Sequence, residues 1–210
     1  MRRGYDAVSE AYRNDDGESN VGTDETTRTY GAWLEELAVH LQAGARVLDI
    51  GCGAGVPADR WLVERGFSVT GIDISAVQIE RARRLVPSAT FFHGDAAAFD
   101  TEDQSLDAVI SLYALIHIPL ADQRRLFARI HRWLRPDGHL LVIVGHDRWT
   151  GVEDYLGAPM FWDHADADTY HRWLGADGFA ILWSRFVPEG TSGHTLLLAR
   201  KRTVERERRQ

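Results

Sequence analysis

The chain has 210 residues, a formal net charge of −7 at pH 7 and a single cysteine, Cys52. This length suits one compact domain, and the acidic charge disfavours sequence-independent nucleic-acid binding, which relies on a cationic surface. We expect a cytoplasmic protein without membrane contact. The single cysteine allows no disulfide within the chain, the start has no apolar signal core, and the most apolar stretch (106–120) is too short to span a bilayer.

The first 44 residues contain two segments with helical character. Residues 5–12 read "YDAVSEAY", and residues 30–44 predict a helix that packs onto the domain. The polar residues 13–28 between them are expected to be mobile.

Between residues 46 and 145, short aliphatic runs alternate with amphipathic segments. The runs predict strands at 46–51, 67–73, 89–95, 106–115 and 139–145, and the segments between them predict helices at 56–66, 75–85 and 119–138. Such alternation favours parallel pairing with right-handed crossovers.

The last third has a different pattern. Residues 146–168 show no sustained period, although they are rich in aromatic residues, and 165–178 predict a helix. Residues 179–187 and 194–202 predict two strands joined by a hairpin loop. We therefore predict an α/β fold, a three-layer α/β/α sandwich whose seven-stranded sheet is mostly parallel, with an antiparallel last strand.

A glycine turn lies between the first strand and the first helix of this alternation, in the stretch "VLDIGCGAG" (47–55). Its backbone amides and the following helix N-terminus can face a ligand. A dinucleotide-binding turn reads G-x-G-x-x-G, whereas here the sixth position is Val56, so the pattern is one residue tighter.

This turn resembles the first motif of the class I, Rossmann-like S-adenosylmethionine-dependent methyltransferases. The stretches "GIDIS", "HGDAAAF", "LDAVISLYALIHIP" and "LRPDGHLLVIV" resemble later motifs of that family, in the same order. The resemblance implies that Asp73 binds both ribose hydroxyls and that Asp95 meets the adenine amine. It also implies that the N-terminal segment folds over the cofactor, S-adenosyl-L-methionine, whose product is S-adenosyl-L-homocysteine.

The resemblance divides the single domain into a helical lid (1–44), a cofactor-binding core (45–145), an aromatic cap insert (146–166), a final helix with a β-hairpin (167–200) and a tail (201–210). The cofactor residues that we expect are Tyr5, Tyr12, Asp49, Gly51, Cys52, Gly53, Gly55, Asp73, Ile74, Gly94, Asp95, Ala96, Ser111, Leu112, Tyr113 and His117. Cys52 is expected to pack rather than to react.

The acceptor is expected outside the carboxyl ends of the strands. Its expected contacts are Tyr113, Trp149, Met160, Phe161, Trp162 and His164, a set that suits an apolar, aromatic or cationic small molecule. The candidate bases are His117 first, then His146, His164, His194 and Glu189. No metal is expected, because Asp166 and Asp168 read as the cap and first turn of a helix.

These patterns favour an enzyme that transfers a methyl group to an O, N or C atom of a small, apolar or aromatic metabolite. The alternatives are a cofactor-binding protein of the same fold without turnover, and a nicotinamide-dependent oxidoreductase, which the tighter glycine spacing disfavours. The expected partner is the small-molecule acceptor, and the oligomeric state is left open.

Overall fold

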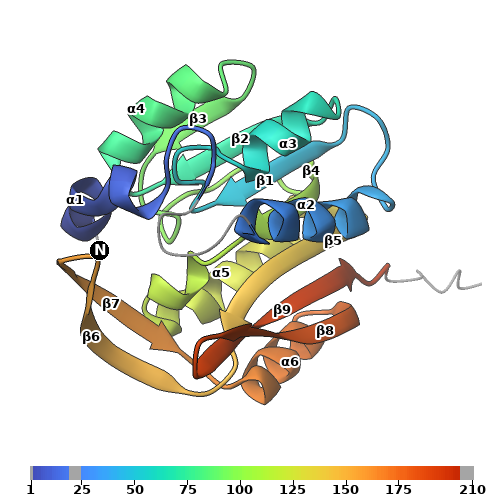
Figure 1. Cartoon of the computed structure of the whole chain (residues 1–210). Coiled ribbons are helices and arrows are strands. Elements are labelled where there is room, and N and C mark those ends of the chain that lie inside the picture. The colour runs from blue at the N-terminus through green and yellow to red at the C-terminus, as the bar shows by residue number, and fades with distance from the viewer. Residues whose placement is uncertain (1, 19–24, 204–210) are drawn as a thin grey trace, which may run out of the picture.

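The computed structural model describes residues 2–18 and 25–203. Its main feature is a seven-stranded sheet with the order β3-β2-β1-β4-β5-β9-β8 (Figure 1). The strands are β1 (Arg46–Ile50), β2 (Ser68–Asp73), β3 (Thr90–His93), β4 (Leu106–Ser111), β5 (Leu134–Gly145), β8 (Phe179–Glu189) and β9 (Ser192–Lys201). Strands β1 to β5 pair in parallel, whereas β9 is antiparallel to both β5 and β8. The predicted α/β fold and its antiparallel last strand are confirmed.

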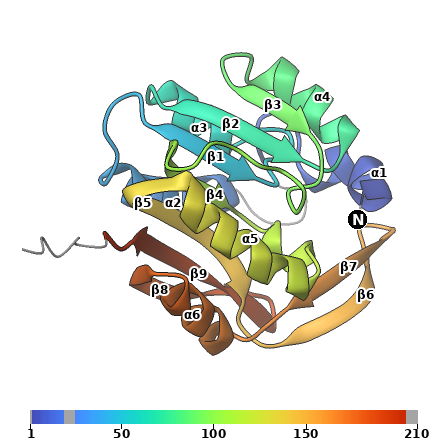
Figure 2. The ribbon, with the colours of Figure 1, turned by 180° about the vertical axis from the view of Figure 1, so that it is seen from behind.

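Helices cover both faces of this sheet. They are α2 (Glu25–Ala38), α3 (Ala58–Glu64), α4 (Ala76–Leu85), α5 (Leu120–Trp133) and α6 (Ala167–Ala176). One core lies between the sheet and α2 with α3, and the other lies between the sheet and α5 with α6 (Figure 2). Every residue of β4 is buried, as expected for a parallel strand covered on both faces.

Helix α5 shows how the sequence pattern produces this packing. Leu126, Phe127, Ile130 and Trp133 follow helical spacing and are at most 1% exposed. They form the apolar face of α5 that rests on the sheet. The helix ends at Trp133, earlier than predicted, because Leu134 already pairs with Leu106 of β4.

The segment after β4 turns earlier than the predicted strand 106–115. Strand β4 ends at Ser111, Tyr113 adopts a left-handed backbone conformation with φ +68°, and η1 (Leu115–His117) forms a short 3-10 helix. This turn brings Tyr113 and His117 to the carboxyl edge of the sheet.

Residues 146–166 differ from the sequence-based expectation of an irregular insert. They contain an antiparallel hairpin, β6 (Trp149–Tyr155) and β7 (Ala158–His164), which forms a separate two-stranded sheet. Its turn uses left-handed conformations at Leu156 and Gly157. Strand β6 is largely exposed, so it has no apolar alternation to reveal it in the sequence.

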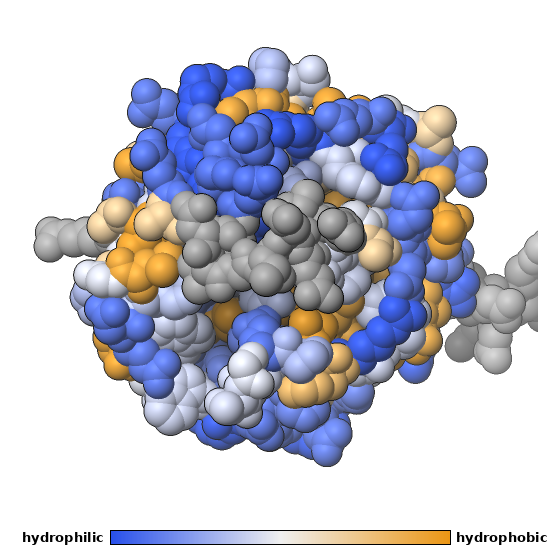
Figure 3. Space-filling model, viewed as in Figure 1, coloured by the Kyte–Doolittle hydropathy of each residue, from blue (hydrophilic) through white to orange (hydrophobic). Residues whose placement is uncertain are grey.

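Helix α1 (Arg2–Tyr12) contacts both α4 and β7, so it lies across the carboxyl edge of the sheet (Figure 1). The face seen in Figure 3 is largely hydrophilic, and its apolar residues form small separate patches. None of the helices within the described ranges is long and apolar enough to cross a membrane. Most of the predicted tail, 204–210, lies outside the described residues.

Candidate functional site

A cavity of about 270 Å³ lies at the carboxyl ends of β1, β2 and β4 and beneath α1. Most of the expected cofactor residues line it: Tyr5, Tyr12, Gly51, Gly53, Asp73, Ile74, Gly94, Asp95, Ala96, Leu112, Tyr113 and His117. They come from six separate stretches of the chain. Parallel strands explain this convergence, because their carboxyl ends meet at one edge of the sheet.

The remaining four expected cofactor residues lie behind the cavity wall. Asp49 is buried, and Cys52 and Gly55 pack in an apolar cluster, where a Cβ on Gly55 would meet Phe91 at 3.1 Å. The Ser111 hydroxyl donates a hydrogen bond of 2.8 Å to the Ile50 carbonyl, so it joins β4 to β1. These residues support the cavity without lining it.

The glycine turn approaches the cavity with its backbone. Gly51 has φ +77°, and a Cβ on it would collide with the Ala114 methyl group. Gly53 has φ +55°, and a Cβ there would find no atom closer than 4.0 Å, so this residue leaves open space on the cavity side. The Gly51 N–H donates to the Ile72 carbonyl at 2.7 Å, which ties the turn to β2. The left-handed conformations explain why glycine occupies both positions.

Asp73 ends β2 with its carboxylate held by two backbone donors. Its Oδ2 accepts from the Gly53 N–H at 3.0 Å, and its Oδ1 accepts from the Ser75 N–H at 2.8 Å. Burial raises the pKa of Asp73, and these two hydrogen bonds oppose the rise. Each oxygen keeps acceptor capacity, so the carboxylate can take two more hydrogen bonds from a diol.

Asp95 follows β3 on the same edge and is exposed. Its Oδ1 accepts from the Ala97 N–H at 2.8 Å, which fixes the carboxylate beside Gly94 and Ala96. A polar group on a ligand that extends from Asp73 along the edge of the sheet can therefore meet a fixed acceptor here.

His117 is the expected base that lies in the cavity wall. Its Nδ1 is 2.7 Å from the Phe161 carbonyl, which can only accept, so Nδ1 carries the hydrogen. Nε2 then accepts from the Tyr5 hydroxyl at 2.9 Å. Burial is the main cause that lowers the pKa of His117 to about 4, so the ring is neutral at pH 7.

The other expected bases lie further along the edge and do not line the cavity. His194 Nδ1 and Glu189 Oε1 are 3.2 Å apart in the β8–β9 hairpin. Burial raises the pKa of Glu189, but hydrogen bonds from His194 and Tyr113 outweigh it and lower the pKa. Tyr113, which does line the cavity, connects this pair to it. His146 hydrogen-bonds the Thr195 hydroxyl at 3.0 Å, outside the cavity lining.

The aromatic insert contributes unequally to the site. Phe161 lines the cavity, and Trp162 packs against the His117 ring with a centroid separation of 5.1 Å. Met160 is fully buried under α1, whereas Trp149 is 45% exposed. His164 is buried and hydrogen-bonds the Asp147 carbonyl at 2.7 Å. Of the six expected acceptor contacts, two line the cavity, Tyr113 and Phe161.

Sequence reasoning missed several residues of the cavity wall: Ile50, Ile72, Gln78, Ala97, Ala114, Ile118 and Asp122. The Gln78 N–H donates to the Ser75 hydroxyl at 3.2 Å, which caps the start of α4. Its side chain also accepts from the Ser9 hydroxyl at 2.9 Å. Gln78 and Asp122 lie in the first turns of α4 and α5. Each of these helices follows a loop at the carboxyl end of a strand, so the first turn of a predicted helix after such a loop could have indicated these two cavity residues in the sequence.

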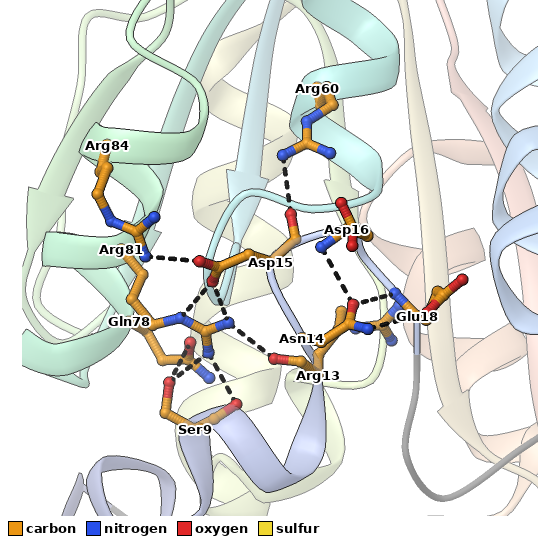
Figure 4. Close-up of polar contacts among 10 residues, drawn as sticks. All are labelled: Ser9, Arg13, Asn14, Asp15, Asp16, Glu18, Arg60, Gln78, Arg81 and Arg84. Carbon is orange, nitrogen blue, oxygen red and sulfur yellow. Dashed lines mark hydrogen bonds and ion pairs between the residues drawn. The ribbon is translucent and has the colours of Figure 1, made fainter.

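A polar network fixes α1 over the cavity (Figure 4). The Arg81 guanidinium on α4 donates to the Ser9 and Arg13 carbonyls, both at 2.8 Å, near the C-terminal end of α1. It also pairs with Asp15 at 2.8 Å, and Arg84 pairs with the other oxygen of Asp15. Residues 13–18, for which mobility was expected, are held to α4 by these contacts, in which Arg81 satisfies carbonyls that the end of a helix leaves free. Residues 19–24 lie outside the described ranges.

Metal ligation has no evident site in the part of the chain that the structure describes, where no three His, Cys, Asp or Glu side chains are grouped to hold an ion. The Asp166 side chain accepts from the Thr169 N–H at 2.7 Å and caps α6, as predicted.

Comparison with known proteins gives a family match. Residues 47–138 match the family model described as a methyltransferase domain. The 27-O-demethylrifamycin SV methyltransferase of Amycolatopsis mediterranei is 38% identical over 135 residues, covering 60% of this chain and 47% of that protein. The 2-methyl-6-phytyl-1,4-hydroquinone methyltransferase of Synechocystis is 36% identical over 127 residues, covering 59% and 38%. The chain thus spans about half or less of the length of these relatives.

Solved structures share the fold across nearly the whole chain. The 1,6-didemethyltoxoflavin-N1-methyltransferase of Burkholderia thailandensis, with bound 1,6-didemethyltoxoflavin and S-adenosylhomocysteine, has a TM-score of 0.70 at 24% identity and covers 96% of this chain and 88% of that one. The [4+2]-cyclase SpnF has a TM-score of 0.73 at 23% identity and covers 96% and 95%. At such identities these structures establish the fold alone.

Proposed function

We propose that the chain is a class I S-adenosylmethionine-dependent methyltransferase that transfers a methyl group from S-adenosylmethionine to a small molecule. The match of residues 47–138 to a methyltransferase domain and the shared fold support this proposal. The observation that carries this proposal is the carboxylate of Asp73. Two backbone N–H groups fix it beside an open glycine turn, with acceptor capacity turned toward the cavity.

The residues present fit this cofactor. Asp73 would accept from the two ribose hydroxyls, and Asp95 from the adenine amine. The open space above Gly53 would admit the amino-acid portion close to the backbone of the turn. Ile74 and Leu112 supply apolar wall for the nucleoside.

The chain's own contribution to the reaction is mainly positioning and exclusion of water. When bound, the cofactor supplies an electrophilic methyl group on a sulfonium, which is a good leaving group. Helix α1 covers the cavity through Tyr5 and Tyr12. His117 has too low a pKa to be a strong base, so we propose that its Nε2 orients the acceptor by taking the hydrogen bond that the Tyr5 hydroxyl now makes.

The acceptor is proposed to be a small, apolar or aromatic metabolite, methylated at an O, N or C atom. Phe161 and Tyr113 give the cavity aromatic walls beside His117. Glu189 and His194 are proposed to act through Tyr113, since Glu189 contacts the Tyr113 side chain and the His194 ring packs edge-on against the Tyr113 ring with a centroid separation of 5.5 Å. The names of the curated relatives support a small-molecule acceptor. A cytoplasmic location belongs to the same proposal.

A second candidate is a protein of this fold that binds the cofactor without methyl transfer. The likeness to a structure described as a [4+2]-cyclase supports it, since the same fold there carries a different activity. The two candidates differ in their products. Methyl transfer raises the acceptor mass by one methylene and converts the cofactor to S-adenosylhomocysteine, whereas the alternative leaves the cofactor unchanged.

The first test is calorimetric titration with S-adenosylhomocysteine, with NAD as the control ligand. One-to-one binding of S-adenosylhomocysteine without NAD binding supports the proposal, and an acceptor screen read by mass spectrometry then separates the two candidates. Binding of NAD alone would contradict both. Asp73→Ala should weaken S-adenosylhomocysteine at least tenfold, since a charged acceptor of two hydrogen bonds is worth about 1.5–3 kcal/mol. Unchanged affinity would refute the ribose assignment.

A further inference from the structure

A phenol of the chain itself lies at the end of the cavity that His117 forms. The Tyr5 hydroxyl is 2.9 Å from His117 Nε2, and both side chains line the cavity. The two rings meet edge to face, with centroids 5.5 Å apart and an interplanar angle of 83°. Burial raises the pKa of Tyr5 well above its usual range, so the hydroxyl keeps its hydrogen. The chain therefore shows how a phenol is held at this end of the cavity.

The backbone of β7 decides which nitrogen of His117 carries the hydrogen. The Phe161 carbonyl lies 2.7 Å from Nδ1 and can only accept, so Nδ1 is the donor and Nε2 is left as an acceptor. The ring is 4% exposed, and burial lowers its pKa to about 4, so it carries no second hydrogen at pH 7. A group that binds at Nε2 must therefore bring a hydrogen of its own.

Two further links hold the Phe161 carbonyl in place. Asp163, two residues further along β7, accepts from the Leu120 N–H at the start of α5 at 2.7 Å. The fully buried Gln123 amide donates to the carbonyls of Ile118, directly after η1, and of Asp163. These bonds tie the end of β7 to the segment that carries η1 and the start of α5. The acceptor role of Nε2 is therefore fixed by the packing of β7 on this segment.

The chemistry of Nε2 selects among the groups that a methyl acceptor can offer. A hydroxyl brings one hydrogen, which matches the single lone pair of Nε2. An amino group brings a second hydrogen that His117 cannot take, and a donor left unpaired in a buried site costs free energy. A carbon nucleophile brings no donor. Because the ring is neutral, it also offers no charge to an ionised group, and a phenol, with a pKa of about 10, is neutral at pH 7.

Aromatic walls complete the match. Phe161 and Tyr113 line the cavity beside His117, and the Tyr12 ring meets the Tyr5 ring edge to face at a centroid distance of 5.8 Å. We propose that the methyl acceptor is a phenol, whose hydroxyl replaces that of Tyr5 as the donor to His117 Nε2 and is methylated on its oxygen. This inference rests on the proposed function and names the substrate class of the same site.

The step is balanced in atoms and charge. When the phenol oxygen takes the methyl group, its O–H bond breaks and the proton passes to His117 Nε2. The electron pair of the former carbon–sulfur bond stays on sulfur, so the positive charge passes from the sulfonium to the imidazolium. A weak base suffices, because the oxygen becomes strongly acidic as its bond to carbon forms. With a pKa of about 4, the imidazolium then returns the proton to solvent.

The test uses aryl compounds that differ only in the group presented to Nε2. The 4-methylphenyl, 2-naphthyl and 4-biphenyl skeletons are each offered as the hydroxyl, amino and methoxy compound. Calorimetry on the protein saturated with S-adenosylhomocysteine gives affinities, and incubation with S-adenosylmethionine, with chromatography against authentic methyl ethers, gives products. For at least one skeleton, the hydroxyl compound should bind about tenfold or more tightly than the methoxy compound, which leaves Nε2 without a donor. It should yield the methyl ether, whereas the amine should yield no methylated product.

Tyr5→Phe isolates the hydrogen bond at Nε2. This variant removes the competing hydroxyl and keeps the ring, so hydroxyl compounds should bind about 3–10-fold more tightly and methoxy compounds should change less than about twofold. Tyr155→Phe is the matched control, the same change on β6. The Tyr155 ring packs against Tyr12 and Trp162 but lies outside the cavity lining, so neither affinity should change in this variant.

The outcomes distinguish this inference from the proposed function. The inference is overturned if hydroxyl and methoxy compounds bind equally, if an amine or a ring carbon is methylated in place of the hydroxyl, or if none of the compounds binds the S-adenosylhomocysteine complex. Each of these results leaves the proposed function standing, whereas a protein that does not bind S-adenosylhomocysteine contradicts the proposed function itself. If Tyr5→Phe fails to fold, the comparison of hydroxyl and methoxy compounds on the unmodified protein still decides the question.

Discussion

Arg81→Ala provides a strong test of how α1 is held over the cavity. The guanidinium is 7% exposed and donates to the carbonyls of Ser9 and Arg13, near the C-terminal end of α1. Its removal leaves both carbonyls without this charged donor. Hydrogen bonds to charged groups contribute about 1.5–3 kcal/mol each and are not additive, so we take ~3 kcal/mol for the docking of α1. The half-exposed Asp15 adds little to this value.

A loss of this size makes opening of α1 about 100-fold more frequent, since 1.4 kcal/mol is a factor of ten. Hydrogen–deuterium exchange read by mass spectrometry should show this acceleration in peptides from 4–13, with protection of β4 and β5 unchanged. S-adenosylhomocysteine should also dissociate faster, because Tyr5 and Tyr12 on α1 line the cavity.

The matched control is Arg84→Ala. Arg84 binds the other oxygen of Asp15 but is 60% exposed and makes no recorded bond to the α1 carbonyls. An exposed pair contributes about 0–1 kcal/mol, so exchange in 4–13 should accelerate less than fivefold. Equal effects of the two variants, or an Arg81→Ala protein in which β4 and β5 lose protection as much as α1, would refute the anchoring role.

Three further predictions follow from the site. Gly51→Ala should abolish binding of S-adenosylhomocysteine, because the added Cβ collides with Ala114. The control is Gly44→Ala: Gly44 has a similar φ of +75° but no neighbour within 4 Å, so this change should lower the free energy of unfolding by only about 1 kcal/mol. In the folded protein the pKa of His117 is lowered from 6.5 to about 4, so the folded state binds fewer protons than the unfolded state between these pH values. The free energy of unfolding that His117 contributes, about 3 kcal/mol, is therefore fully present above pH 6.5 and is lost as the pH falls from 6.5 to 4. His117→Gln should flatten the urea-unfolding profile in that window, and an unchanged slope would contradict the assignment. Burial raises the pKa of Asp59 to about 7, so its effect on stability runs in the opposite direction: the free energy of unfolding falls as the pH rises from 4 to 7. Urea unfolding should therefore show Asp59→Asn to be ~2–4 kcal/mol more stable than the wild type at pH 7 and equally stable at pH 4.

The central sheet could be predicted because its strands are buried aliphatic runs. The stretch "VLDIGCGAG" carried both the first strand and the family resemblance, which the match over 47–138 confirms. The hairpin β6–β7 could not be predicted in the same way. It rests on α1 through buried side chains of β7 such as Met160, while β6 stays exposed, so its stability depends on a segment about 150 residues away in the chain.

The candidate site divides along the same line. Asp73 and Gly53 could be placed because residues at strand ends converge for any parallel sheet. Arg81 and Gln78 could not, because their partners Ser9 and Arg13 come from a distant segment. In the sequence, Arg81 is one of three arginines in "RARR" and resembles a solvated helix face, and its selection as the anchor depends on α1 docking against that side of α4.

Charge state is the part of the site that sequence reasoning cannot reach. Asp49 lies inside β1 one residue before its end, Asp73 ends β2 and Asp95 follows β3, and by residue type the three are equivalent acceptors. Their surroundings differ: Asp95 is exposed, Asp73 is held by two backbone donors, and Asp49 faces the buried Asp59. A carboxylate with backbone donors can bind neutral hydroxyls at any pH where it is ionised, whereas burial raises the pKa of Asp49 and so favours its neutral form. The order of these acids along the sheet edge thus places an acceptor of fixed orientation for hydroxyl groups at β2 and an exposed acceptor for a polar ring edge at β3.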